Sequence, residues 1–157
     1  MSNFVKENRL RLARNLSGAA VASIVTSSLF TQMGYSGGAN IRDFANQLAT
    51  AVVSFGAAAV LVTCLVSRNR FMVDVALVSL LGALIGSVLK VAILEGANGV
   101  PSYIEQATQQ HSWRPLIALM TDCLEFTAFL TVISLPLVTF GAWVFRVVSK
   151  QISDSPA

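Results

Sequence analysis

The stretch LIALMTDCLEFTAFLTVISLPLVTFGAWVF, residues 116–145, decides the fold class of this chain. A helix rises about 1.5 Å per residue, and the hydrocarbon core of a bilayer is about 30 Å thick. A run this long and this apolar is therefore typical of a tilted or kinked membrane span rather than of a soluble helix. It nevertheless carries two acids, Asp122 and Glu125, which makes these side chains the first candidates for a function.

The composition of the whole chain agrees with a membrane location. The chain has 157 residues, of which 54% are apolar and 12% charged, and its mean hydropathy is +0.66. Soluble domains carry about a quarter charged residues, so we interpret residues 1–157 as a single polytopic membrane domain. The net charge of +3 comes from basic residues that flank the apolar runs. This distribution is typical of a topology signal and argues against a nucleic-acid partner.

The apolar runs predict an all-α membrane protein, a four-helix transmembrane bundle. The polar segment before the last span matches a capping box at Ser102 and Glu105, which predicts a short amphipathic interfacial helix over residues 102–111 in the outer loop. The N-terminal arm is basic, but no apolar core precedes a cleavage site, so we expect it to be retained rather than removed as a signal peptide. The expected spans are residues 16–33, 47–66, 71–94 and 116–145.

The distribution of Lys and Arg predicts the orientation. Eight lie in the N-terminal arm, in the turn at residues 67–70 and in the C-terminal tail, whereas the other two loops hold only Arg42 and Arg114. Positive residues stay on the cytoplasmic side. We therefore expect both termini in the cytoplasm and the loop at residues 95–115 outside, with a bacterial inner membrane as the setting.

Three ionisable residues and a threonine form a candidate polar site in the outer half of the bundle. Lys90 and Asp122 are expected at similar depths and can form a salt bridge. Glu125 is expected about 13 Å below the outer surface at about 1.5 Å per residue, on one helix face with Asp122 and Thr121. A charge inside a span costs about 2.5–3.5 kcal/mol unless it is paired, neutralised or hydrated. We favour a static clamp between helices; a transport or gating site and a binding site for a helix or lipid are the alternatives.

Other residues are candidates for structural roles. Asp74 is expected to form an ion pair with Arg70 or Arg146 at the cytoplasmic end. Gly82 and Gly86 form a GxxxG motif, which favours close helix packing within the monomer over a dimer face. Pro136 lacks the amide hydrogen of a regular helix and predicts a kink near residue 132, as a bend rather than a transporter hinge.

Several chemistries have no support in the sequence. His111 is the single histidine and has no Cys or carboxylate at ligand spacing, so no metal site or cofactor is expected. Cys64 and Cys123 lie in apolar runs and are interpreted as free thiols. No catalytic motif is present, so we do not expect an enzyme.

These observations predict a small non-enzymatic integral membrane subunit of a larger assembly, such as a secretion, transport or immunity-type system. Its partners would be the lipid bilayer and either other membrane proteins or further copies of itself. The alternative is a self-contained oligomeric channel or a proton- or cation-coupled transporter that uses Glu125 and Asp122.

Overall fold

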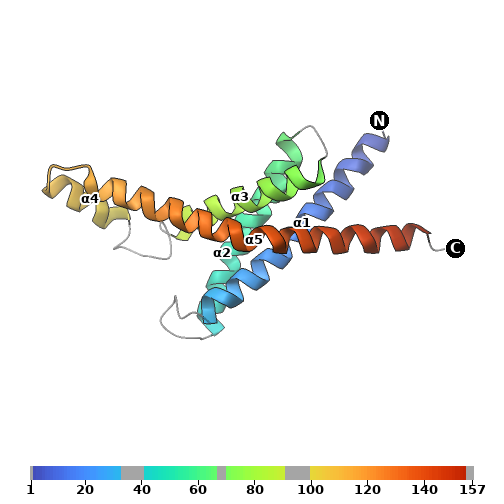
Figure 1. Cartoon of the computed structure of the whole chain (residues 1–157), viewed down its shortest axis with the longest axis horizontal. Coiled ribbons are helices and arrows are strands. Elements are labelled where there is room, and N and C mark those ends of the chain that lie inside the picture. Colours follow the sequence, from blue (N-terminus) through green and yellow to red (C-terminus); the bar gives the residue numbers. More distant parts are fainter. Residues whose placement is uncertain (1, 33–40, 67–69, 91–99, 155–157) are drawn as a thin grey trace.

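The residues that the structure describes form an all-α bundle of five helices (Figure 1). A computed structural model describes residues 2–32, 41–66, 70–90 and 100–154. Four long helices form a ring in which α1 packs on α2, α2 on α3, α3 on α5 and α5 on α1, while the short helix α4 packs on α5. The helices are α1 (Ser2–Gln32), α2 (Ile41–Leu65), α3 (Phe71–Leu89), α4 (Val100–Gln109) and α5 (Arg114–Asp154).

Three stretches are long and apolar enough to cross a membrane, which indicates an integral membrane protein. Within the described residues they are Phe44–Leu65, Phe71–Leu89 and Arg114–Ile152. The helices expected from the second, third and fourth apolar runs are therefore confirmed. The last four residues of the predicted third span, 91–94, lie outside the described residues.

Helix α1 differs from the expected pattern. It is one continuous helix from Ser2, so the basic arm and the apolar run expected over residues 16–33 form a single element. It is not among the three apolar stretches, because its second half is rich in Ser and Thr. Four of these side chains are buried, and each donates a hydrogen bond to the carbonyl oxygen four residues earlier: Ser23, Thr26, Ser27 and Thr31.

The packing of α1 against α5 depends on two glycines. A Cβ atom on Gly18 would lie 2.6 Å from the Val138 carbonyl oxygen, and one on Gly141 would lie 2.7 Å from the Ser17 carbonyl oxygen. Ser17 Oγ also donates a hydrogen bond to the Gly141 carbonyl oxygen at 3.2 Å. The two backbones are thus in direct contact, as small residues allow in membrane helix pairs.

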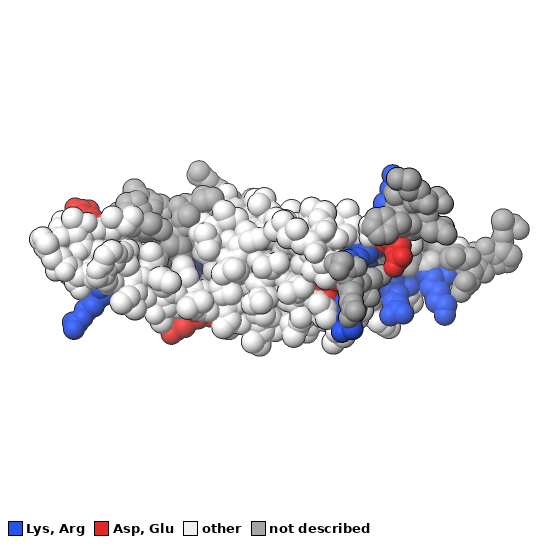
Figure 2. Space-filling model, turned by 90° about the horizontal axis from the view of Figure 1, so that it is seen from above, with Lys and Arg blue, Asp and Glu red and all other residues white. Residues whose placement is uncertain are grey.

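Most of the described Lys and Arg side chains lie at one end of the bundle. The N-terminal end of α1, the C-terminal end of α2, the start of α3 and the C-terminal part of α5 lie together at this end (Figure 1). Lys and Arg side chains gather there, and the middle of the visible face is mostly uncharged (Figure 2). An uncharged band beside a basic end is the pattern expected for helices that cross a bilayer.

At the opposite end, α4 and the first turns of α5 extend beyond the other helices (Figure 1). With 41 residues, α5 is about 60 Å long at about 1.5 Å per residue, twice the thickness of a hydrocarbon core. The turn between α4 and α5 is closed by His111, which has φ 49°, and by a hydrogen bond from the Ser112 amide to the Ala107 carbonyl oxygen. This is the left-handed C-terminal cap of a helix. The helix predicted over residues 102–111 begins two residues earlier, at Val100, so Ser102 lies within its first turn and is not its N-cap.

Candidate functional site

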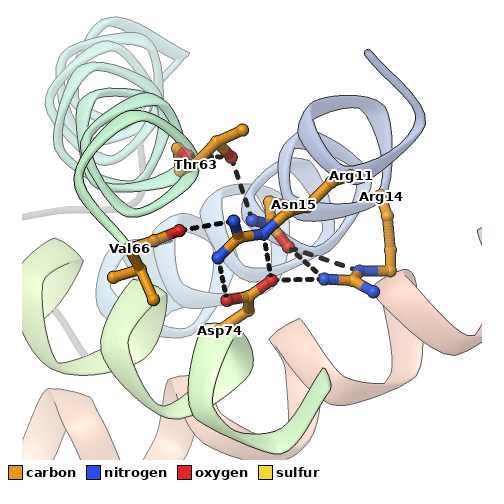
Figure 3. Close-up of polar contacts among 7 residues, drawn as sticks. Arg11, Arg14, Asn15, Thr63, Val66 and Asp74 are labelled. Atoms are coloured by element: carbon orange, nitrogen blue, oxygen red, sulfur yellow. Dashed lines mark hydrogen bonds and ion pairs between the residues drawn. The ribbon is translucent and has the colours of Figure 1, made fainter. Parts of the chain in front are cut away.

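The main polar site is a buried ion cluster at the basic end of the bundle, which we call the arginine centre (Figure 3). Asp74 lies in the first turn of α3 and is 0% exposed. Arg11 of α1 binds it with two parallel hydrogen bonds, from Nε to Oδ2 at 2.7 Å and from Nη2 to Oδ1 at 2.5 Å. Arg11 Nη1 also donates to the carbonyl oxygen of Val66, directly after α2, at 2.6 Å. One guanidinium therefore joins α1 to the end of α2 and the start of α3.

A second arginine completes the centre. Arg14 Nη2 donates to Asp74 Oδ2, and its guanidinium lies 5.4 Å from the ring centroid of Phe71. Asn15 accepts hydrogen bonds from Arg14 at 3.4 Å and donates one from Nδ2 to Thr63 Oγ1 of α2 at 3.1 Å. Two guanidiniums thus share a single buried carboxylate (Figure 3).

The helix termini explain why the cluster lies where it does. The last carbonyl groups of a helix have no partner within the helix and carry a partial negative charge, whereas the first turn favours an acid. Arg11 satisfies the Val66 carbonyl at the end of α2, and Asp74 lies at the start of α3. The centre therefore fixes the α2–α3 hairpin against α1.

The pKa values of the two arginines are shifted in opposite directions. Hydrogen bonding to Asp74 raises the pKa of Arg11 above its ordinary value, against an opposing effect of burial. Burial lowers the pKa of Arg14; the nearby positive charges of Arg11 and Arg146 lower it further, while Asp74 raises it.

This arrangement differs from the ion pair that the sequence predicted for Asp74. Arg70 and Arg146 are both exposed, and neither forms a salt bridge with Asp74 in the part of the chain described. The partners come from α1, 63 and 60 residues away. The sequence contains one sign of this face of α1. Buried polar and small residues follow one another there at spacings of four and three residues, which places them on one side of a helix: Arg11, Asn15 and Gly18.

The structure does not bring together the residues of the predicted outer polar site. Lys90 Nζ lies 4.1 Å from the ring centroid of Phe126, a cation–π contact. Thr121, Asp122 and Glu125 are exposed on the outside of α5, and neither acid forms an ion pair with a described residue. The predicted Lys90–Asp122 salt bridge is not formed.

The contacts of its neighbours place Glu125 along the bundle, while its predicted depth below the membrane surface stays a prediction. Thr127 Oγ1 donates to Ser87 Oγ at 2.9 Å, and Phe126 contacts Lys90, the residue that follows α3. Glu125 therefore lies level with the C-terminal end of α3. Asp122 lies about one helical turn farther out, in the segment that extends toward α4.

The small residues singled out in the sequence have clear positions. A Cβ atom on Gly82 would lie 2.2 Å from the Phe55 ring of α2, so Gly82 makes room for that ring. Gly86 faces Ser54 of α2 at ordinary contact distance. Pro136 lies inside α5, which continues through it to Asp154.

A small cavity lies between the four long helices, in the half of the bundle near α4. Its volume is about 40 Å³, enough for a few water-sized molecules but not for an organic substrate. Hydroxyl, amide and ammonium groups line it together with aromatic rings: Thr26, Gln47, Ser54, Lys90, Phe30 and Phe126.

No metal site is formed by the described residues, among which no three His, Cys, Asp or Glu side chains lie close enough to hold an ion. Comparison of the chain with protein-family models, with curated proteins and with solved structures found no match. The function must therefore be argued from the geometry.

Proposed function

We propose that this protein is a small non-enzymatic subunit of a larger membrane assembly and that it binds a helix of another membrane protein through the outer half of α5. The observation that carries the proposal is an uncovered apolar stripe beside two carboxylates. Trp113, Ile117, Met120 and Leu124 follow at spacings of four, three and four residues and are 77%, 60%, 66% and 62% exposed. This spacing places the last three on one face of α5, with Trp113 directly before its first residue, as in the seam of two packed helices.

Neither lipid nor water suits this part of α5. Lipid would accept the stripe but not the carboxylates of Asp122 and Glu125, and water would accept the carboxylates but not the stripe. A protein surface with apolar residues and hydrogen-bond donors satisfies both.

Charge favours a different protein over a second copy. Between Ile117 and Val132, α5 contains two acids and no Lys or Arg. A symmetric pair of these faces would bring carboxylates toward carboxylates, which is unfavourable. We therefore expect the partner helix to carry Lys, Arg or neutral donors opposite Asp122 and Glu125.

The proposal includes α1 as a fourth span. Apart from Phe30, its buried face is polar or small, whereas Leu16, Ile24 and Leu29 point outward at 40%, 55% and 36% exposure. Apolar side chains outside and polar ones inside suit a helix in lipid. With the basic end in the cytoplasm, as the distribution of Lys and Arg favours, α4 and the stripe lie at the outer side of a bacterial inner membrane.

Site-specific photo-crosslinking tests the proposed surface. A photoreactive phenylalanine at Met120 should give one discrete adduct with another membrane protein in intact cells, and one at Phe140, exposed on the other half of α5, should not. Reversing both charges, Asp122→Lys with Glu125→Lys, should reduce the Met120 adduct at least fivefold without lowering the unfolding temperature. Adducts only with a second copy, only with lipid, or equal at both positions contradict the proposal.

A channel or coupled transporter is the alternative proposal. Asp122 and Glu125 lie on the outside of the single chain, so a path lined by them requires several copies arranged around it. Proton and cation flux into liposomes containing the purified protein separates the two proposals. Flux that disappears in Glu125→Gln would replace the subunit proposal with transport.

A further inference from the structure

A second pocket lies at the basic end, next to the arginine centre, and nothing argued above gives it a role. Its volume is about 370 Å³, and it lies between α1, the start of α3 and the C-terminal part of α5. We call it the arginine pocket. Its lining includes Glu7, Arg11, Arg14, Phe71, Phe145 and Arg146.

The pocket has more positive than negative charge. Three guanidiniums, those of Arg11, Arg14 and Arg146, lie against two carboxylates, Glu7 at the pocket and Asp74 behind it. Arg11 directs its donors to Asp74 and Val66. Among the described side chains at the pocket, one positive charge is thus left over.

Two of the arginines have donors available for a ligand. The hydrogen bonds of Arg14 to described residues use Nε and Nη2 and leave Nη1. The Arg146 side chain is exposed and donates to no residue in the described part of the chain. Both side chains line the same pocket, one from α1 and one from α5.

A phosphate group fits this arrangement better than other anions. Guanidinium groups bind phosphate oxygens through paired, charge-assisted hydrogen bonds. One wall of the pocket is apolar, formed by Leu10, Phe71 and Phe145, which suits the first carbons of a lipid attached to that phosphate. Basic pockets between helices at the cytoplasmic surface are favourable sites for anionic headgroups.

We propose that the arginine pocket binds a phosphate group through Arg14 and Arg146, presented by an anionic phospholipid of the membrane or by a free phosphate. Either source brings the negative charge that the three guanidiniums lack. The proposal does not depend on the partner surface of α5, which lies at the other end of the molecule.

The test measures binding of short-chain phosphatidylglycerol, short-chain phosphatidylcholine and inorganic phosphate to the full chain, purified in a mild detergent. Arg146→Gln removes a ligand donor without breaking a described contact. Lys150→Gln is the matched control, since it removes the same charge one turn later on α5, outside the pocket lining. We expect Arg146→Gln to weaken binding about tenfold, the loss typical of one hydrogen bond to a charged group, and Lys150→Gln to weaken it less than twofold.

The arms of the experiment distinguish the source of the phosphate. Binding to phosphatidylglycerol that millimolar phosphate does not displace assigns the pocket to a lipid, and displacement by phosphate assigns it to a soluble anion. Equal weakening by Arg146→Gln and Lys150→Gln would reduce the effect to general surface charge and overturn the proposal. The same holds if neither phosphatidylglycerol nor phosphate binds.

Discussion

At the scale of single residues, Asp74 is the side chain that holds the arginine centre together. It is fully buried and accepts hydrogen bonds from both Arg11 and Arg14. Removing one partner of a buried ion pair costs about 3–5 kcal/mol, because the remaining charge stays buried without compensation. Asp74→Ala should therefore lower the free energy of unfolding by about this amount, as measured by denaturant titration of the helical signal in detergent.

Two further variants separate the ion pair from a general effect of substitution. Arg11→Met combined with Asp74→Leu should regain part of the loss, since an apolar pair of similar size can replace a buried ion pair. Arg70→Gln, on the exposed side chain next to α3, should change the free energy of unfolding by less than about 0.5 kcal/mol. Equal stability of Asp74→Ala and Arg70→Gln would show that the arginine centre contributes nothing.

The need of Asp74 for a cationic partner was predictable from the cost of a charge in a span, but the identity of that partner was not. Arg70 and Arg146 were inferred from expected depth alone. The actual partners follow from which helix lies beside the start of α3 and from the continuation of α1 through Arg11. Composition and hydropathy carry no information on the order of helices around a ring.

At the scale of helices, the contact between α1 and α5 is the closest and gives the next prediction. A methyl group on Gly18 would overlap the Val138 carbonyl oxygen, and one on Gly141 would overlap the Ser17 carbonyl oxygen. These are backbone atoms that cannot move aside, so Gly18→Ala or Gly141→Ala should cost about 1–3 kcal/mol in thermal or denaturant unfolding.

Gly56→Ala is the control for this contact. No atom lies within 4 Å of a Cβ added there, so the change should be neutral or stabilise α2 by up to about 1 kcal/mol through helix propensity. If Gly18→Ala were as stable as Gly56→Ala, the direct backbone contact of α1 and α5 would be wrong.

How far the helices were predictable depends on what limits their length. The bilayer limits an apolar run at both ends, which is why α2, α3 and the apolar part of α5 were found from hydropathy. The first turns of α5 extend beyond the described end of α3, and α5 is about twice as long as a hydrocarbon core is thick, so hydropathy alone does not fix where its acids lie. The polar face of α1 lowers its mean hydropathy. Only the packing shows that Leu16, Ile24 and Leu29 face outward.

At the scale of the whole molecule, the ends of the bundle give a topology that labelling can test. The two termini lie at the basic end and α4 at the other (Figure 1). In a chain with Cys64→Ala and Cys123→Ala, a membrane-impermeant maleimide should label Gln109→Cys in intact cells. Lys150→Cys should react only after the membrane is opened, because the basic end is expected in the cytoplasm.

Asn8→Cys decides whether α1 crosses the membrane. Because α1 runs from the basic end toward the end that holds α4, a spanning α1 places Asn8 on the same side as Lys150. Asn8→Cys should then be protected in intact cells like Lys150→Cys. Labelling of Asn8→Cys from outside, with Lys150→Cys still protected, would leave three spans and contradict the contact of Arg11 with Asp74, because Asp74 lies at the same end of the bundle as Lys150. The α1 side of the arginine pocket would then lie across the membrane from Arg146 and Phe71, so the pocket could not form.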